Sequence, residues 1–149
     1  MVQNDVKQNR ARTGESTELN RPWDERLRVN ICGLTFQTPL VLLSGCVGFG
    51  EEYTRVEGFS NSDAGAVCLK GTTLEPRLGN PPHRVYETPD GMLNSIGLQN
   101  PGARSVVDAI LPELDFTETR FIANVSGSTI EEYEAVTRIF DASPIDAIE

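Results

Sequence analysis

A lysine and a run of amide side chains are the residues of this sequence best suited to bind a small molecule. Lys70 ends the apolar run Ala66–Leu69 and is followed by Gly71 and a long polar loop. Residues 91–102 then combine glycines with amide side chains such as that of Asn94. A cation at the end of a buried strand must bind an anion or reach solvent, and amides supply both donors and acceptors. Together they predict a pocket for a small anionic ligand.

Four short apolar runs would carry these residues. Most are followed directly by a small or polar residue, as Ser44, Lys70 and Ser126 show. Unbroken apolar runs of this length are typical of strands buried on both faces, as in a parallel sheet covered by helices. The runs are Leu40–Leu43, Ala66–Leu69, Phe121–Val125 and the start of a fourth at Ala147.

Helices are expected in the intervals between these runs, over residues 51–59, 103–114 and 129–140. Thr129 followed by Glu132 has the spacing of a capping box. One face of this last helix is apolar and is expected to pack in the core. That face carries Ile130, Tyr133, Val136, Thr137 and Phe140.

The intervals suit an α/β fold of the barrel type. Residues 27–36 alternate apolar and polar around Cys32-Gly33, which predicts a β-hairpin, whereas the polar residues 1–26 are expected to form a flexible arm. Residues 27–149 would form the N-terminal part of a (β/α)8 TIM barrel, with three βα units, the start of strand four and the hairpin across the opposite mouth. A complete barrel needs about 250 residues, so we expect a piece of a longer enzyme or a truncated product.

Composition excludes several classes of function. The 149 residues carry a net charge of −9, which argues against binding nucleic acid or an anionic membrane surface. No apolar run is long enough to span a bilayer, and no secretory signal is recognisable. Three cysteines without C-x-x-C spacing and a single histidine argue against a zinc site. These features predict reduced thiols and a cytoplasmic protein without a metal site.

Five motifs together resemble the class 1 dihydroorotate dehydrogenases. The form with Gly-Thr-Thr after the lysine, and with Glu-Thr-Pro ahead of Gly-Met-Leu-Asn, is most similar to subclass 1B. The motifs are ordered and correctly spaced, and the resemblance covers residues 27–149. They are Leu43–Gly50, Lys70–Arg77, Gly79–Pro81, Glu87–Gly102 and Ile122–Gly127.

The resemblance implies an oxidoreductase of pyrimidine biosynthesis. Members of this family are TIM-barrel flavoproteins that bind FMN at the carboxyl ends of the strands and oxidise dihydroorotate to orotate. In subclass 1B, electrons pass through a partner subunit that carries FAD and an iron–sulfur cluster to NAD⁺, and the resemblance also leads us to expect a homo-oligomer.

The resemblance also assigns roles to individual residues. It places dihydroorotate against Lys70, Asn94, Ser95, Ile96, Gly97 and Leu98. It places FMN against Ser44, Gly45, Lys70, Gly71 and Asn124. The catalytic base of the family is a cysteine in a loop that would follow Glu149, so Cys46 is not expected to be catalytic and the 149-residue chain alone is expected to be inactive.

Other interpretations of the same residues stay open. Lys70 could form a structural ion pair, Asn124 could bond a backbone carbonyl, and the small strand-end residues also suit tight turns. At the level of function, one alternative is a related flavin barrel acting on another dihydropyrimidine. The other is a non-catalytic truncated product.

Overall fold

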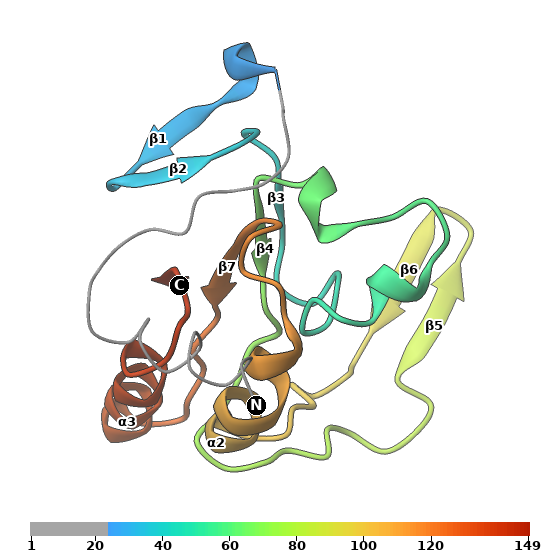
Figure 1. Ribbon diagram of the computed structural model, residues 1–149. Coiled ribbons are helices and arrows are strands. Elements are labelled where there is room, and N and C mark those ends of the chain that lie inside the picture. The colour runs from blue at the N-terminus through green and yellow to red at the C-terminus, as the bar shows by residue number, and fades with distance from the viewer. Residues whose placement is uncertain (1–23) are drawn as a thin grey trace.

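A parallel sheet of four strands forms the centre of the structure, a computed structural model that describes residues 24–149 (Figure 1). The strands lie side by side in chain order, and each neighbouring pair is parallel. Val67 pairs with Leu42 on one side, and with Phe121 on the other. The predicted α/β class with a parallel sheet is therefore confirmed. The strands are β3 (Val41–Leu42), β4 (Ala66–Cys68), β7 (Arg120–Ala123) and β8 (Ala147–Ile148).

Two helical segments pack on one face of this sheet. The first is α2 (Ala103–Ser105), which continues as the π-helical turn η5 (Val106–Ile110) and the 3-10 turn η6 (Leu111–Glu113). The second is α3 (Ile130–Asp141); the two lie side by side in Figure 1. Side chains alternate between the faces of a strand, so the residues at every second position share this buried layer. They are Val67, Leu69, Phe121 and Ala123 on the strands, with Ala103, Val106, Leu111, Val136, Ile139 and Phe140 on the helices.

The predicted N-cap and apolar face of α3 are confirmed in part, since Thr129 is the N-cap and Val136 and Phe140 are buried. The Thr129 side chain accepts a hydrogen bond from the Glu132 amide at 3.2 Å, as an N-cap should. The Glu132 carboxylate accepts from the Ser128 amide, so the predicted reciprocal capping box is only half formed. The prediction that Ile130 and Tyr133 pack in the core is wrong, since these side chains are 81% and 45% exposed. The first turn of the helix extends beyond the sheet, and burial begins only at Val136, with Ile139 and Phe140.

The helix predicted over residues 51–59 does not form. In its place lies the 3-10 turn η3 (Tyr53–Arg55), followed by η4 (Asn61–Asp63). Gly58 has φ +86°, a left-handed conformation that ends a helix, and the β-branched Val56 is already extended. Helix propensity in this short stretch is too low to outweigh these residues.

Two antiparallel hairpins flank the sheet. The pair β1 (Val29–Ile31) and β2 (Leu34–Phe36) forms where the alternation predicts it, and follows the 3-10 turn η2 (Glu25–Leu27). Of the polar arm predicted over residues 1–26, residues 1–23 lie outside the described residues. The second hairpin, β5 (Val85–Thr88) and β6 (Gly91–Asn94), was expected to be loop.

Burial differs between the central and the edge strands. All three residues of β4 are buried, as predicted for a strand covered on both faces. The prediction is wrong for the run Leu40–Leu43, whose end residues Leu40 and Leu43 flank β3 and are 56% and 65% exposed. The strand β3 has a neighbour on one side only among the described residues. None of the helices in residues 24–149 has both the length and the hydrophobicity of a membrane-spanning segment.

Candidate functional site

Lys70 lies at the carboxyl end of β4, as its position after an apolar run predicts. The strand pairing continues beyond Cys68, because the Leu69 amide donates to the Ile122 carbonyl at 2.8 Å. The Lys70 amide then donates to the Gly48 carbonyl at 2.8 Å. Its side chain is half-buried, and it forms no ion pair with another residue of the described part of the chain. The interpretation of Lys70 as a structural ion pair therefore receives no support within residues 24–149.

A cavity of about 490 Å³ opens beside Lys70. Two cations, Lys70 and Arg77, contribute to its wall, and no carboxylate does. The Arg77 guanidinium donates to the Ser128 hydroxyl at 2.8 Å. Such a lining attracts a small anion, which is the ligand type expected from the sequence. The other lining residues are Phe49, Pro76, Leu78, Gln99, Asn100 and Pro101.

Three chain segments converge at Gly71. A methyl group built on this glycine would lie 2.8 Å from Asn124 Oδ1, 2.9 Å from Leu98 Cδ1 and 3.1 Å from Ser126 Oγ. The segments are held by ladder bonds, since the Thr72 amide donates to the Asn124 carbonyl at 2.9 Å. The tertiary structure thus brings together three of the predicted site residues, Gly71, Leu98 and Asn124, in contacts too close for a side chain at position 71.

Asn94 and Ser95 lie farther out. Asn94 ends β6 and is exposed, and it is not among the residues that line the Lys70 cavity. Asn80 holds the segment that follows, because its side-chain amide donates to the Ser95 hydroxyl at 2.9 Å and its backbone amide to the Ile96 carbonyl at 2.9 Å. Gly97 has φ +78° and passes so close to Asn80 that a Cβ would meet the Asn80 amide nitrogen at 2.6 Å. Within the predicted substrate segment, Leu98 therefore contacts the end of β4, whereas Asn94 does not line the Lys70 cavity.

Asn100 is a site residue that the motif analysis did not single out. Its side chain is buried and accepts from the Gly102 amide at 2.9 Å, and it donates to the Leu98 carbonyl at 2.9 Å. It also donates to the Thr73 hydroxyl at 3.0 Å. Because a buried amide must be paired, its place between the predicted substrate segment and a helix was a signal that could have identified it. Asn100 fixes Leu98 against the end of β4.

The end of β3 supplies the other predicted cofactor residues. Ser44 is half-buried and follows β3 directly after Leu43. Gly45 has φ +85° with open space beside it. Cys46 is exposed in the same turn. Ser44, Gly71 and Asn124 thus follow three adjacent strands of the sheet, each at its carboxyl end.

Cys68 and Glu149 form a pair at this edge that the sequence did not indicate. The Cys68 thiol donates to Glu149 Oε2 at 2.8 Å, and the Asn124 amide donates to the same oxygen at 2.8 Å. Burial, the hydrogen bond and the negative charge of Glu149 raise the pKa of the Cys68 thiol to about 12. The bonds from Cys68 and Asn124 lower the pKa of Glu149. At neutral pH the thiol is therefore protonated and the carboxylate ionised.

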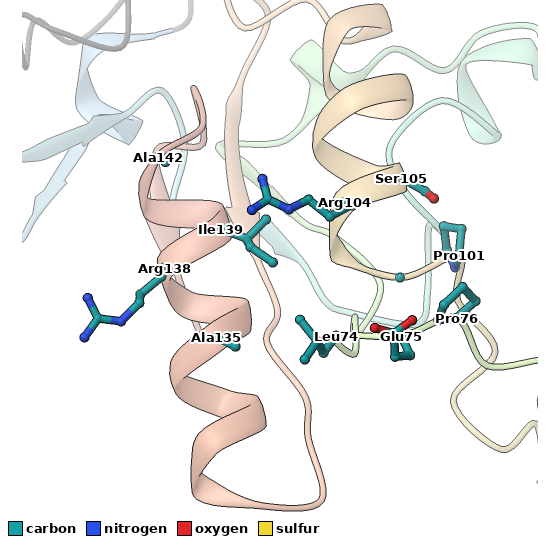
Figure 2. A pocket seen from close by; sticks show the side chains of 11 residues that line it. Leu74, Glu75, Pro76, Pro101, Arg104, Ser105, Ala135, Arg138, Ile139 and Ala142 are labelled. Atoms are coloured by element: carbon teal, nitrogen blue, oxygen red, sulfur yellow. The ribbon is translucent and has the colours of Figure 1, made fainter.

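A second and larger cavity, of about 700 Å³, lies between α2 and α3 (Figure 2). Leu74 and Ile139 point into it, and Arg104 and Arg138 lie on either side. It holds none of the residues that the sequence assigned to a site, and it lies in the helical layer rather than at the strand ends. The smaller cavity is therefore the better candidate, since its lining includes Lys70, Arg77 and Asn100.

Comparisons with known proteins match this chain to one enzyme family. A sequence model described as dihydroorotate dehydrogenase matches residues 26–149. The catalytic subunit of dihydroorotate dehydrogenase B (NAD(+)) from Bacillus caldolyticus is 49% identical over 119 residues, which are 80% of this chain and 37% of that protein. The subunit of the same name from Anoxybacillus flavithermus is 50% identical over 125 residues, 83% of this chain and 39% of that protein. The chain thus spans about two-fifths of these curated relatives.

The fold is also similar to that of a solved structure. The crystal structure of DHODH from Eimeria tenella in complex with ferulenol superposes with a TM-score of 0.60 and 24% sequence identity. The match covers 97% of this chain and 41% of that one.

Proposed function

The chain belongs to the dihydroorotate dehydrogenase family, class 1B, and from that premise we propose that the protein oxidises dihydroorotate to orotate in pyrimidine biosynthesis, with FMN as its cofactor. The observation that carries the proposal is the cationic cavity at the carboxyl end of β4, where Lys70 and Arg77 lie without a carboxylate beside them. Dihydroorotate is a small carboxylate, so its charge matches this lining.

The strand ends fit a flat cofactor. Gly71 allows the backbone at the end of β4 to lie close to Asn124, because a Cβ there would come within 2.8 Å of the Asn124 oxygen. Ser44, Gly45, Gly71 and Asn124 would hold FMN, with backbone groups from three adjacent strands and one carboxamide. When bound, FMN accepts a hydride from the substrate. Lys70 supplies positive charge at the rim where negative charge would develop, an arrangement that stabilises the transition state.

The segment Asn94–Leu98 would cover the substrate. Leu98 already packs beside Gly71, and its carbonyl is bound by the buried Asn100. Asn94 and Ser95, on the exposed end of the hairpin, would supply polar contacts to the pyrimidine ring. No catalytic base is assigned within residues 24–149.

The proposed architecture of the whole enzyme is a TIM barrel. Four parallel strands in chain order would form the first half of such a barrel, and a site at the strand ends supports this proposal. The names of the relatives describe a catalytic subunit of an NAD(+) enzyme. We therefore infer a second subunit, carrying FAD and an iron–sulfur cluster, that takes the electrons onward, and a homo-oligomeric catalytic core.

The test is anaerobic reduction of the flavin in the intact protein, purified together with its electron-transfer subunit. Dihydroorotate is expected to bleach the flavin absorbance, with orotate formed in equal amount. Dihydrouracil, which lacks the carboxylate, is expected to leave the flavin oxidised. Bleaching by dihydrouracil alone would assign the protein to another dihydropyrimidine, and absence of flavin from the purified protein would reject the proposal.

A further inference from the structure

A chain of hydrogen bonds joins the carboxyl ends of three neighbouring parallel strands, β4, β7 and β8. The Cys68 thiol donates to Glu149 Oε2 at 2.8 Å, and Asn124 after β7 donates its side-chain N–H to the same oxygen at 2.8 Å. One oxygen atom of Glu149, the residue after β8, therefore accepts hydrogen bonds from side chains of two other strands.

The backbone holds Glu149 in this place. Its amide donates to the Ala123 carbonyl at 2.8 Å, and its carbonyl accepts from the Val125 amide at 3.0 Å. The pairing continues the β7–β8 register, in which Ile122 lies opposite Ala147. Asn124 and Glu149 are thus opposite each other across neighbouring strands, on the face that also carries Cys68 and Lys70.

The carboxylate decides which way the Asn124 carboxamide points. An ionised carboxylate can only accept hydrogen bonds, so the Asn124 nitrogen must face Glu149. The Asn124 oxygen then faces the opposite way, toward Gly71, where a Cβ would come within 2.8 Å of it. A neutral partner able to donate would allow the reverse orientation, with the nitrogen at Gly71.

We propose that Glu149 is a positioning residue for the cofactor: its carboxylate orients the Asn124 carboxamide so that an acceptor oxygen, and not a donor nitrogen, faces the flavin site beside Gly71. The inference rests on the proposed function, because it assigns Asn124 to FMN. Glu149 acts through Asn124 and is not itself placed against the ring. Cys68 donates the second bond and keeps the carboxylate aligned.

A double-mutant cycle on FMN affinity tests this coupling in the intact protein. Glu149→Met removes both acceptor oxygens at similar side-chain length, and it is expected to weaken FMN binding about tenfold, the effect of a lost charge-assisted hydrogen bond. In an Asn124→Ala background the same change should alter the affinity less than about twofold. Glu149→Gln, which retains one acceptor, should lie between the wild type and Glu149→Met.

Glu134→Met is the matched control. Glu134 also accepts a charge-assisted bond, from Arg138 at 2.6 Å, but it lies on the exposed surface of α3. This variant is expected to bind FMN as the wild type does. Equal losses for Glu149→Met with and without Asn124 would overturn the inference, and so would no loss in either background.

A charge exchange provides a second route if Glu149→Met does not fold. Asn124→Asp places two carboxylates together and should abolish FMN binding. Adding Glu149→Gln restores one donor and one acceptor, and it leaves an oxygen of the introduced aspartate toward Gly71, so binding should return to within about tenfold of wild type. Failure of this rescue in a folded double variant contradicts the proposed orientation.

The Cys68 thiol gives a readout that does not involve the flavin. Removing the Glu149 charge removes one cause of its raised pKa, so peptide-resolved alkylation of Cys68 at pH 9 should be faster in Glu149→Met than in the wild type. An unchanged alkylation rate counts against the pairing. Absence of FMN from every protein, wild type included, would reject the proposed function and the inference with it, whereas FMN held equally by wild type and Glu149→Met would reject the inference alone.

Discussion

The two ends of the parallel sheet use charge in opposite ways. At the amino end, Arg120 and Asp146 form an ion pair at 3.2 Å with 3% and 6% of their side chains exposed. At the carboxyl end, the half-buried Lys70 forms no ion pair within residues 24–149 and faces a cavity. The charges of Arg120 and Asp146 neutralise each other and contribute to structure. Lys70 has no carboxylate beside it in the cavity wall, so its charge is available to a ligand.

The hydrogen bonds around these charges follow the same division. Arg120 Nε donates to the Thr35 carbonyl of β2 at 3.0 Å, and Asp146 accepts from the Phe121 amide at 2.9 Å. The pair therefore fastens the β1–β2 hairpin to the sheet. At the opposite end, the Asn124 side-chain nitrogen is bonded to Glu149, and its oxygen lies close to Gly71 as an available acceptor. This separation of a structural end from a reactive end is the arrangement known for TIM barrels.

The strongest expected effect is on stability, from the amino end. Arg120→Ala should lower the free energy of unfolding by about 3–5 kcal/mol, because it leaves Asp146 charged and buried. Arg55→Ala, which breaks the exposed pair with Glu51 at 3.9 Å, should cost less than about 1 kcal/mol. Urea denaturation followed by circular dichroism measures both. If the two variants lost equal stability, the amino end would have no special structural role.

A large effect on activity, with little on stability, is expected from Lys70→Met. We predict a fall in kcat/KM for dihydroorotate of about a hundredfold, as for the loss of one preorganised electrostatic group, and a melting temperature close to that of the wild type. Arg104→Met is the control, because this cation lines the other cavity. Steady-state kinetics and thermal denaturation are compared for the three proteins. A Lys70→Met protein with a lowered melting temperature but full activity would assign Lys70 a structural role, which contradicts the comparison of the two ends.

Gly71→Ala is expected to weaken FMN binding about tenfold. The added methyl would lie 2.8 Å from Asn124 Oδ1 and must displace it, while the backbone at this residue does not itself require glycine. Gly91→Ala is the matched control, since its Cβ would meet no atom closer than 4.0 Å. Fluorescence titration with FMN gives both dissociation constants. Equal affinities in the two variants would mean that the close approach of Gly71 and Asn124 does not contribute to FMN binding.

The smallest expected effect is a difference in thiol reactivity. Cys32 and Cys46 are exposed and Cys68 is buried, with a pKa raised to about 12. Cys68 should therefore resist iodoacetamide at pH 8, while the exposed thiols react, as read by peptide mass spectrometry. Below about pH 9 the thiol is protonated in both folded and unfolded chains. Between about pH 9 and 12 only the unfolded chain releases this proton, so the thiol makes stability fall as the pH rises. Rapid labelling of Cys68 at pH 8 in the folded protein would contradict its protonated, bonded state.

The strands could be predicted from the sequence because their signal is local. Short apolar runs such as Ala66–Leu69 indicate strands by their composition alone, and the small or charged residues after them mark the carboxyl ends. The alternation around Cys32-Gly33 gave the first hairpin for the same reason. The β5–β6 hairpin also had a local signal, Asp90-Gly91 between two β-prone segments, which the motif analysis treated as loop.

Predictions that depended on which other elements pack against a segment were less successful. Ile130 and Tyr133 have the right spacing for a buried face, yet the sheet does not extend far enough to cover them. The helix predicted over residues 51–59 fails at Val56 and Gly58, where local propensity is too weak to overcome the extended and left-handed backbone. Periodicity gives the direction in which a side chain points, not what it meets there.

The sequence alone determined the parallel α/β class, the placing of Lys70, Gly71 and Asn124 at strand ends, and the similarity of its motifs to one enzyme family. Only the tertiary structure decided that Leu98, and not Asn94, packs at Gly71, that Asn100 holds it there, and that Cys68 and Asn124 share one oxygen of Glu149. The reason is physical: these contacts join residues far apart in the chain, and they depend on strand register, which places side chains from separate segments within a few ångströms of each other.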